Sequence, residues 1–356
     1  MSPRPFPSPN DAPEVPLAEL TGAGPIKQAM DLGSSASAPA LGPGWLSDFA
    51  WTEGRLHIRK TDVRLRFDWP VISEILTWIP YLGMTAVAAV AARLTSPSRL
   101  KLWFAPDRPR PWYMIRGAAL WGGIAAARNP EEADAAFYFD DVTRGRATPP
   151  PGLPAINFNC TDVSKTHVAR VFEEVFGYPL ALDPTAADGS IVEKSDKNGV
   201  HDGRVLHAPA LPRDGFVYQR LVDTEAGGFN HDLRTVCVGG APVFVVHKRK
   251  AAGESFAIHT RRATLETPDS LFSAAELALI TRFNARMGLD WGGLDILRDR
   301  TDGRIYIVDV NKTDLGPVIA LSWADKARSM RRLGLALKEL ILERKVAPAV
   351  RVSHAA

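Results

Sequence analysis

Apolar residues recur along the chain with the two periods that distinguish helices from strands. In 161–177 they are spaced three or four positions apart, as in an amphipathic helix, and Gly177 supplies its end. A second such helix is predicted for 273–288, where Ser273 and Glu276 have the spacing of a capping box. A further helix is predicted near the carboxyl terminus, over about 322–343.

Shorter apolar runs predict the strands. They are 101–105, 134–141, 190–195, 216–223, 232–238, 242–250, 292–299 and 303–311. Gly239-Gly240 and Asp302-Gly303 each join two consecutive runs, so each joined pair is expected to form a hairpin. With a helix predicted over 112–128, the first two strands form a small α/β domain, and the whole chain is expected to be of the α/β (α+β) class.

Residues 71–92 form a hydrophobic stretch that is long enough to cross a bilayer, with Glu74 as its only charge. Pro80 and Gly83 interrupt the stretch, and its many alanines make it only weakly hydrophobic. These features favour two short helices packed on the body of the protein. Contact with a membrane surface is the alternative, and a spanning helix is disfavoured.

Composition is that of a soluble globular protein with an unusual amino terminus. Nine of the 28 prolines lie in 1–44, which predicts a disordered tail that lacks the apolar segment of a secretory signal. The formal net charge of +3 gives no indication of nucleic-acid binding. The two cysteines, Cys160 and Cys237, exclude a disulfide scaffold and indicate a cytoplasmic protein.

These patterns divide the chain into six parts. We expect a disordered tail (1–44), a helical hydrophobic segment (45–97), a small α/β domain (98–155), two further subdomains (156–216 and 217–345) and a flexible tail (346–356).

Acidic residues near the second hairpin provide the first candidate chemistry. Strand alternation places Asp309 and Asn311 on one face, and a pairing in which residue numbers sum to about 604 would set Asp295 opposite Asp309. Opposed carboxylates destabilise a sheet, whereas two carboxylates and an amide oxygen suit a hard cation such as Mg²⁺. The alternative is that these acids are simply solvated at the end of a strand.

The order of these features resembles the ATP-grasp superfamily, in particular its peptide-bond-forming carboxylate–amine ligases. A lysine at the head of a helix is followed by a strand ending in lysine, a glycine-containing loop, an Asp-x-Arg hairpin and the Asp…Asp-x-Asn pair. The similarity covers about 156–343, and the DVN of GRIYIVDVNKTD is its most specific element, with Asp309 where glutamate is commoner. The resemblance implies an ATP-grasp fold in which the subdomain 156–216 forms a lid over 217–345.

The resemblance also implies roles for individual residues. The residues expected to bind ATP are Lys165, Lys194, Gly199, Gln219, Arg220, Leu221, Val222 and Asp232. Lys165 and Lys194 would reach the phosphates, while the loop 195–204 would close over them. The segment 219–222 would hold adenine through its backbone, and Asp232, or alternatively Asp223, would bind the ribose.

The remaining candidates concern the metal and the reacting groups. Mg²⁺, or Mn²⁺ in its place, would be held by Asp295, Asp309 and Asn311. The charges of Arg234, Lys248 and Arg249 are expected to converge at one sheet end, where an anion such as a polyphosphate or a phosphorylated intermediate would offset their repulsion. A stripe of solvated charges is the alternative. Arg261 and Arg262 are weaker candidates for binding a substrate carboxylate.

The activity implied by the resemblance is ATP-dependent ligation of a carboxylate and an amine through an acyl phosphate, with release of ADP and phosphate. The substrates would be small molecules or peptides. The alternatives are an ATP-grasp kinase that phosphorylates a hydroxyl and a regulatory protein that binds ATP without turnover. The oligomeric state and the identities of the substrates stay open.

Overall fold

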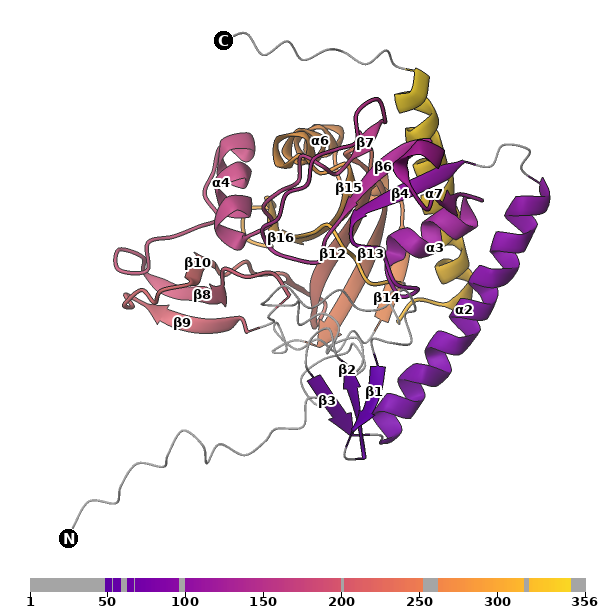
Figure 1. Ribbon diagram of the computed structural model, residues 1–356. Helices are drawn as coiled ribbons and strands as arrows, with labels where there is room; N and C mark the ends of the chain where they lie inside the picture. Colours follow the sequence, from indigo (N-terminus) through magenta and orange to yellow (C-terminus); the bar gives the residue numbers. More distant parts are fainter. Residues whose placement is uncertain are drawn as a thin grey trace.

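The protein is described by a computed structural model that covers most of the chain. The described ranges are 49–52, 54–58, 63–66, 68–95, 100–199, 202–251, 262–316 and 320–346. The predicted tail 1–44, residues 347–356 of the carboxyl-terminal tail and Arg261 lie outside them. Within the described residues the protein is a mixed α/β structure, as expected, with four β-sheets (Figure 1).

The small α/β domain is built on a parallel four-stranded sheet of order β5-β4-β6-β7. Its strands are β4 (Lys101–Pro106), β5 (Ala125–Ala126), β6 (Ala135–Phe139) and β7 (Ala155–Ile156), with the short η4 (Pro130–Glu132) before β6. The predicted strand–helix–strand order is confirmed. The helix α3 (Met114–Trp121) is shorter than 112–128, because Gly122 and Gly123 turn the chain and the next residues extend beside β4 as β5.

A second, antiparallel sheet of order β10-β8-β9 occupies the region predicted as the lid. Its strands are β8 (Gly189–Ser195), β9 (Arg204–Ala208) and β10 (Phe216–Arg220), preceded by α4 (Lys165–Phe176). Ser164 caps the start of α4, and Gly177, with φ 78°, ends it. The strand β9 was not predicted, because its sequence RVLHA follows a polar loop and has no clear alternation.

The largest sheet has the order β14-β13-β12-β15-β16, with β11 paired to β12. Its strands are β11 (Glu225–Ala226), β12 (Phe229–Val238), β13 (Ala241–Ala251), β14 (Arg262–Glu266), β15 (Trp291–Arg298) and β16 (Ile305–Asn311). Both predicted hairpins are present. Gly239 and Gly240 have φ of 63° and 77°, the left-handed conformation that a two-residue hairpin turn requires.

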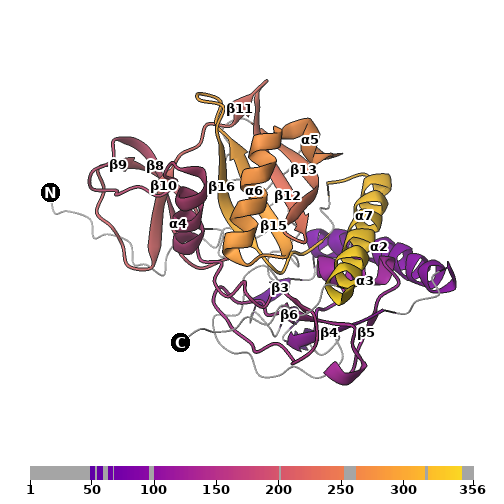
Figure 2. The same ribbon diagram turned by 90° about the horizontal axis from the view of Figure 1, so that it is seen from above.

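Helices cover this sheet and join it to the small domain. They are α5 (Pro268–Leu271), α6 (Ala274–Met287) and α7 (Trp323–Val346). The predicted capping box of Ser273 and Glu276 is formed at the start of α6. Figure 2 shows α6 across one face of the sheet with α4 beside β16, while α7 packs against α3 on the other side of the molecule.

The region 45–97 differs from its prediction in two ways. Residues 49–66 contain an antiparallel sheet of β1 (Phe49–Thr52), β2 (Arg55–Ile58) and β3 (Val63–Arg66), not helix. The hydrophobic stretch forms one helix, α2 (Trp69–Thr95), not two. Pro80 lies inside this helix, on its exposed side.

Candidate functional site

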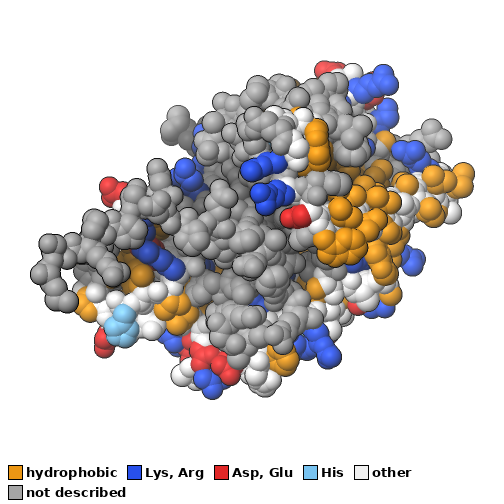
Figure 3. Space-filling view, turned by 90° about the horizontal axis from the view of Figure 1, so that it is seen from below, with side chains coloured by type: hydrophobic (Ala, Val, Ile, Leu, Met, Phe, Trp, Pro, Cys, Tyr) orange, Lys and Arg blue, Asp and Glu red, His pale blue; other side chains and the backbone are white. Residues whose placement is uncertain are grey.

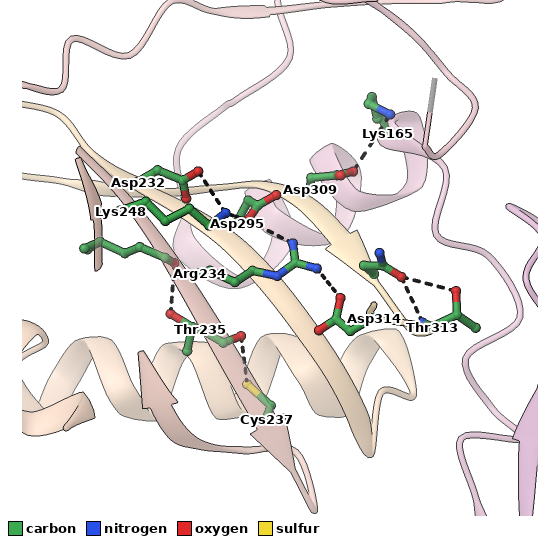
Figure 4. A network of polar contacts seen from close by, with 12 residues as sticks. Lys165, Asp232, Arg234, Thr235, Cys237, Lys248, Asp295, Asp309, Thr313 and Asp314 are labelled. Atoms are coloured by element: carbon green, nitrogen blue, oxygen red, sulfur yellow. Dashed lines mark hydrogen bonds and ion pairs between the residues drawn. The ribbon is translucent and has the colours of Figure 1, made fainter. Parts of the chain in front are cut away.

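A row of charged side chains crosses one face of the largest sheet. In the strand register Lys248 lies opposite Asp232, Arg234 opposite Asp295, and Asp295 opposite Asp309. The predicted pairing of the two aspartates is therefore confirmed, and the register shifts by one residue directly after Asp295. Four adjacent strands thus bring together groups that are up to 77 positions apart (309 − 232) in the sequence (Figure 4).

Arg234 stands between two carboxylates. Its Nη1 lies 2.9 Å from Asp295 Oδ1, and its Nη2 donates to Asp314 Oδ1, an acid that sequence reasoning did not select. Burial alone would lower the pKa of this guanidinium, but Asp295 and Asp314 hold the pKa well above its usual value. A Cβ on Gly293 would come within 2.2 Å of Asp314 Oδ2 and 2.7 Å of Arg234 Nε, so glycine at this position makes room for the pair.

Lys248 is the second cation of the row. Its Nζ lies 3.2 Å from Asp232 Oδ2 and 3.6 Å from Asp295 Oδ1, and Lys250 Nζ lies 3.8 Å from the same Asp232 oxygen. Burial opposes the charge of Lys248, but Asp232 and then Asp295 raise its pKa above the usual value. Asp295 responds in the opposite direction: burial alone would raise its pKa, whereas Arg234 and Lys248 together hold that pKa far below its usual range.

The predicted convergence of three cations on an external anion needs correction. Arg234 and Lys248 are already paired with carboxylates of the chain, so their repulsion is offset without a ligand. Arg249 lies opposite His231 and alternates with Lys248 along β13, so it faces the other side of the sheet. Arg262, the other described arginine proposed for a substrate carboxylate, pairs with Arg249 across β13 and β14.

Two lysines approach the same acids from different elements. Lys165 is on α4, which packs against β16 and α6, and Lys194 is on β8 of the smaller sheet. Lys165, at the first position of α4, is buried, and its Nζ lies 3.8 Å from Asp309 Oδ1. Lys194 extends from β8 into the site: burial lowers its pKa, Asp309 opposes that effect, and Lys165 adds to it. The two lysines predicted to bind phosphate are therefore both near Asp309, one of the acids predicted to bind the metal.

The described part of the predicted lid loop is held to the start of α4. Lys165 Nζ donates to the carbonyl oxygen of Lys197 (2.8 Å), and the Thr166 amide donates to Asp196 Oδ1 (2.9 Å). Arg144 Nη2 donates to Asp196 Oδ2 (2.6 Å), which links the loop to the small domain. Gly199 has φ 76° at the last described residue of this part of the loop.

Asn311 shares its side-chain oxygen with a network that sequence reasoning missed. Asn311 Oδ1 accepts a hydrogen bond from the Thr313 amide (2.8 Å), and the Thr313 hydroxyl donates to Asp141 Oδ1 (2.7 Å). The Tyr113 hydroxyl donates to Asp141 Oδ2 (2.5 Å). Asp141 and Tyr113 come from the small domain, so this network joins that domain to the end of β16.

The predicted adenine segment lies at the end of β10. The amide of Arg220 donates to the carbonyl of Leu180, and its guanidinium pairs with Asp299 (3.0 Å). The Gln219 side chain is 1% exposed, and neither its oxygen nor its nitrogen has a hydrogen-bond partner. Leu221 and Val222 follow the strand, and Val222 is buried.

The two acids proposed for the ribose differ in their surroundings. Asp223 is bound by Arg300 in an exposed ion pair, whereas Asp232 lies in the charged row with one carboxylate oxygen, Oδ1, buried and without a hydrogen bond.

Lys312, directly after Asn311, is also buried, and its Nζ makes no hydrogen bond and lies 4.9 Å from the Tyr138 ring centre. Burial raises the pKa of the nearby Cys160 thiol to about 12, which makes it unreactive.

The charged groups together suit a cation and a polyanion. Asp309 Oδ1 is buried and accepts no hydrogen bond, which leaves it available to a metal ion. Five cations (Lys165, Lys194, Arg234, Lys248 and Lys250) stand against four carboxylates (Asp232, Asp295, Asp309 and Asp314), a formal net charge of +1 (5 − 4). No group of three or more His, Cys, Asp or Glu side chains suited to a metal occurs in the described ranges, and Mg²⁺ needs only one or two carboxylates.

Comparisons with known proteins give distant similarity of structure only. No protein-family model matches the sequence, and no curated protein is significantly similar to it. Solved structures that resemble the chain include the ATP-grasp ligase PsnB with its minimal precursor, Mg and ADP (14% identity, 69% of this chain and 98% of that chain, TM-score 0.46).

Two other similar structures come from named organisms. They are the macrocyclase MdnC with precursor peptide MdnA from Microcystis aeruginosa (13% identity, 68% and 99% covered, TM-score 0.40) and the D-alanine–D-alanine ligase from Bacillus anthracis with ATP (11%, 69% and 98%, TM-score 0.39). At these identities and TM-scores the likeness assigns neither an activity nor a substrate to this chain.

Proposed function

We propose that this protein is an ATP-grasp ligase, which uses ATP and Mg²⁺ to join a carboxylate to an amine and releases ADP and phosphate. The observation that carries the proposal is the meeting of lysines from α4 and β8 with the acids of the large sheet at one charged site. Lys165 and Lys194 approach from α4 and β8, and they face Asp295 and Asp309 on adjacent strands of the large sheet. Lysines opposite paired carboxylates are the arrangement that a metal–polyphosphate complex requires.

The residues of the chain divide the work of binding. Asp309 and Asp295, with the Asn311 side-chain oxygen, would hold Mg²⁺, which supplies charge neutralisation at the phosphates when it is bound. The two lysines would bind phosphate oxygens, and the loop after β8 would exclude water. The amide of Gln219 offers an acceptor and a donor to the adenine edge, since both of its polar atoms are buried without partners.

Arg234 and Lys248 then act as positioning residues. Both hold Asp295 ionised and fix its orientation, because each forms an ion pair with its carboxylate. Asp232 is the better candidate than Asp223 for the ribose, because its Oδ1 is buried without a hydrogen-bond partner, whereas both oxygens of Asp223 accept hydrogen bonds.

The proposed reaction has two balanced steps. A carboxylate oxygen of the first substrate attacks the γ-phosphorus of ATP, the bond to the β-phosphate oxygen breaks, and ADP leaves. The amine of the second substrate attacks the carbonyl carbon of the acyl phosphate, phosphate leaves with its bonding pair, and the amine loses a proton. The chain contributes positioning and electrostatic stabilisation, so the reaction needs no nucleophilic side chain.

Hydroxylamine provides a test that does not require the natural amine. We expect a carboxylate pool with ATP, Mg²⁺ and hydroxylamine to give hydroxamates and equal amounts of ADP and phosphate. Asp309→Asn should abolish product, while Asp302→Asn, at the turn of the same hairpin, should retain it. A stable phosphorylated product that forms without hydroxylamine would indicate a kinase instead, and tight ATP binding with no turnover would indicate a regulatory protein.

The compartment is also a proposal. Cys160 and Cys237 are both free and buried, which supports a cytoplasmic enzyme.

A further inference from the structure

The outer face of α2 is apolar along its whole length. Exposed large side chains occur at both ends and between them: Trp69 (71% exposed), Leu76, Ile79, Val87 (72%), Val90 and Leu94 (83%). From the first to the last of these the helix rises about 38 Å at 1.5 Å per residue. Only 17% of the most hydrophobic window within Ile75–Thr95 is buried. Figure 3 shows the resulting hydrophobic patch on the surface.

The inner face of α2 is fixed to the body of the protein. Tyr81 and Thr85 are buried there, and Trp121 Nε1 of α3 donates to Thr85 Oγ1 at 3.4 Å. A Cβ on Gly117 would come within 2.8 Å of the Tyr81 hydroxyl, so α2 and α3 are in close contact. The helix is therefore held along the surface, in an orientation that presents its opposite side outward.

That outward side lacks the polar residues that a water-facing surface helix carries. Glu74 and Arg93 are the only charged residues in the sequence of α2. Successive residues of a helix are turned by 100° about its axis, so Ala86, Val87 and Ala91 lie at about 0°, 100° and 140° around it. All three are exposed, and the exposed arc is therefore about 140° wide. This arc is wider than the narrow seam by which two helices of a coiled coil meet.

Basic residues border the patch at both ends. Arg93 lies in the last turn of α2 and is exposed. At the other end Arg55 on β2 and Arg66 on β3 are exposed and lie opposite each other. Arg66 is three positions before Trp69, and the exposed acid Asp68 lies between it and the helix. Figure 3 shows basic side chains beside the hydrophobic patch.

We propose that α2 is a membrane-surface helix, which lies in the plane of an anionic lipid bilayer with its outer face among the acyl chains. A wide apolar face bordered by cations fits such a surface, because lipid covers the full width of the face while anionic headgroups meet the arginines. A second copy of the chain would cover only part of this arc and would bring the same arginines together. The inference is independent of the proposed ATP chemistry.

This inference reverses the expectation that 71–92 packs against the body without touching a membrane. The sequence does not show which side of α2 is occupied, since its apolar residues surround the helix. Only the position of α3 shows that one side is filled and the other is left exposed.

Flotation of the full-length protein with vesicles tests the proposal. We expect it to float with phosphatidylcholine vesicles that contain phosphatidylglycerol, to float less with phosphatidylcholine alone, and to bind less tightly as salt is raised. Val87→Asp should weaken partitioning about tenfold or more, since it removes an aliphatic side chain that the bilayer would bury and introduces a negative charge that anionic lipids repel. Leu211→Asp, in the lid region and 85% exposed, is the matched control and should float like the wild type.

A fluorescent label reports where the helix lies. Both natural cysteines are buried, so Val87→Cys can be labelled selectively with a polarity-sensitive dye, with Leu211→Cys as the control. Vesicles should shift the emission of the label at 87 to the blue and leave that at 211 unchanged. Extraction at alkaline pH should release the protein, as expected for a helix that does not span the bilayer.

Four results would overturn the proposal. The protein fails to float with either vesicle, or Val87→Asp floats as well as the wild type. A third result is that the label at 87 reports an apolar environment even without vesicles, which would mean that protein already covers the face. Light scattering would then identify the cover as a second copy if the protein is a dimer, or as another part of the chain if it is a monomer. Alkali-resistant insertion would indicate a spanning helix.

Discussion

Replacing Arg234 with methionine should destabilise the protein, because this side chain neutralises two carboxylates that water reaches poorly. The Arg234 side chain is 14% exposed, Asp314 is 2% exposed and Asp295 is 26% exposed. Breaking a buried ion pair by removing one partner typically costs 3–5 kcal/mol, and the partial exposure of Asp295 favours the lower end of that range. We therefore expect a loss of about 3 kcal/mol in the free energy of unfolding at pH 7.

A double-mutant cycle separates the ion pair from other effects of the substitution. Asp314→Asn in the Arg234→Met background should recover part of the loss, with a coupling energy of about 1–3 kcal/mol. The matched control is Arg300→Met, because Arg300 and Asp223 form an exposed pair whose loss should cost less than about 1 kcal/mol. Urea unfolding without nucleotide measures Arg234→Met, Asp314→Asn, the double variant, Arg300→Met and the wild type under the same conditions.

The same variant should change the response to acid. Arg234 and Lys248 depress the pKa of Asp295 in the folded state, so its contribution to stability is complete above the unfolded pKa of about 3.9 and is lost as the pH falls below it. Without Arg234 this depression shrinks, and the variant should lose less stability than the wild type between about pH 5 and pH 3. A stability loss no larger than that of Arg300→Met, or a cycle without coupling, would refute this account of the charged row.

Three further predictions concern the lid and the thiols. Lys194→Ala should weaken ATP binding by about ten- to a hundredfold in calorimetry, since it removes one charged contact to the phosphates. The substitution should not lower the stability of the fold, because burial already disfavours the charge of Lys194. The control Lys197→Ala should bind ATP normally. Saturating ATP and Mg²⁺ should slow amide hydrogen exchange across the loop 195–204; unchanged exchange would argue against a lid. Iodoacetamide should modify Cys160 and Cys237 only after unfolding, because burial raises the pKa of each thiol to about 12, and rapid labelling of the native protein would contradict their burial.

Local sequence rules predicted the hairpins and the opposition of the two metal-site acids. The Asp302-Gly303 turn is short, so it determines the pairing of the strands on either side, and Asp295 lies opposite Asp309 as a consequence. Capping boxes and glycine stops are equally local, which is why α6 begins and ends close to the predicted residues. Such features depend on neighbours within a few positions along the chain.

Features that depend on tertiary contact were not predicted. Asp314 lies 80 positions from Arg234, and no periodic pattern marks it as the second partner of that arginine. Lys248 and Arg249 are adjacent in β13, so their side chains point to opposite faces of the sheet. The prediction that both converge on one anion considered their charge and not this alternation. The break expected at Pro80 did not occur: α2 continues through the proline, and its packing against α3 is a tertiary contact that the sequence pattern does not show.

Calorimetric titration of ATP with and without Mg²⁺ into the wild type and Asp309→Asn tests the central claim most directly. We predict that Mg²⁺ strengthens ATP binding to the wild type but not to Asp309→Asn. The variant should unfold with a free energy close to that of the wild type, because relief of the repulsion with Asp295 offsets the loss of the ion pair with Lys165. If Asp309→Asn binds ATP and Mg²⁺ like the wild type and is clearly less stable, the acids hold the fold together and do not hold a metal–nucleotide complex.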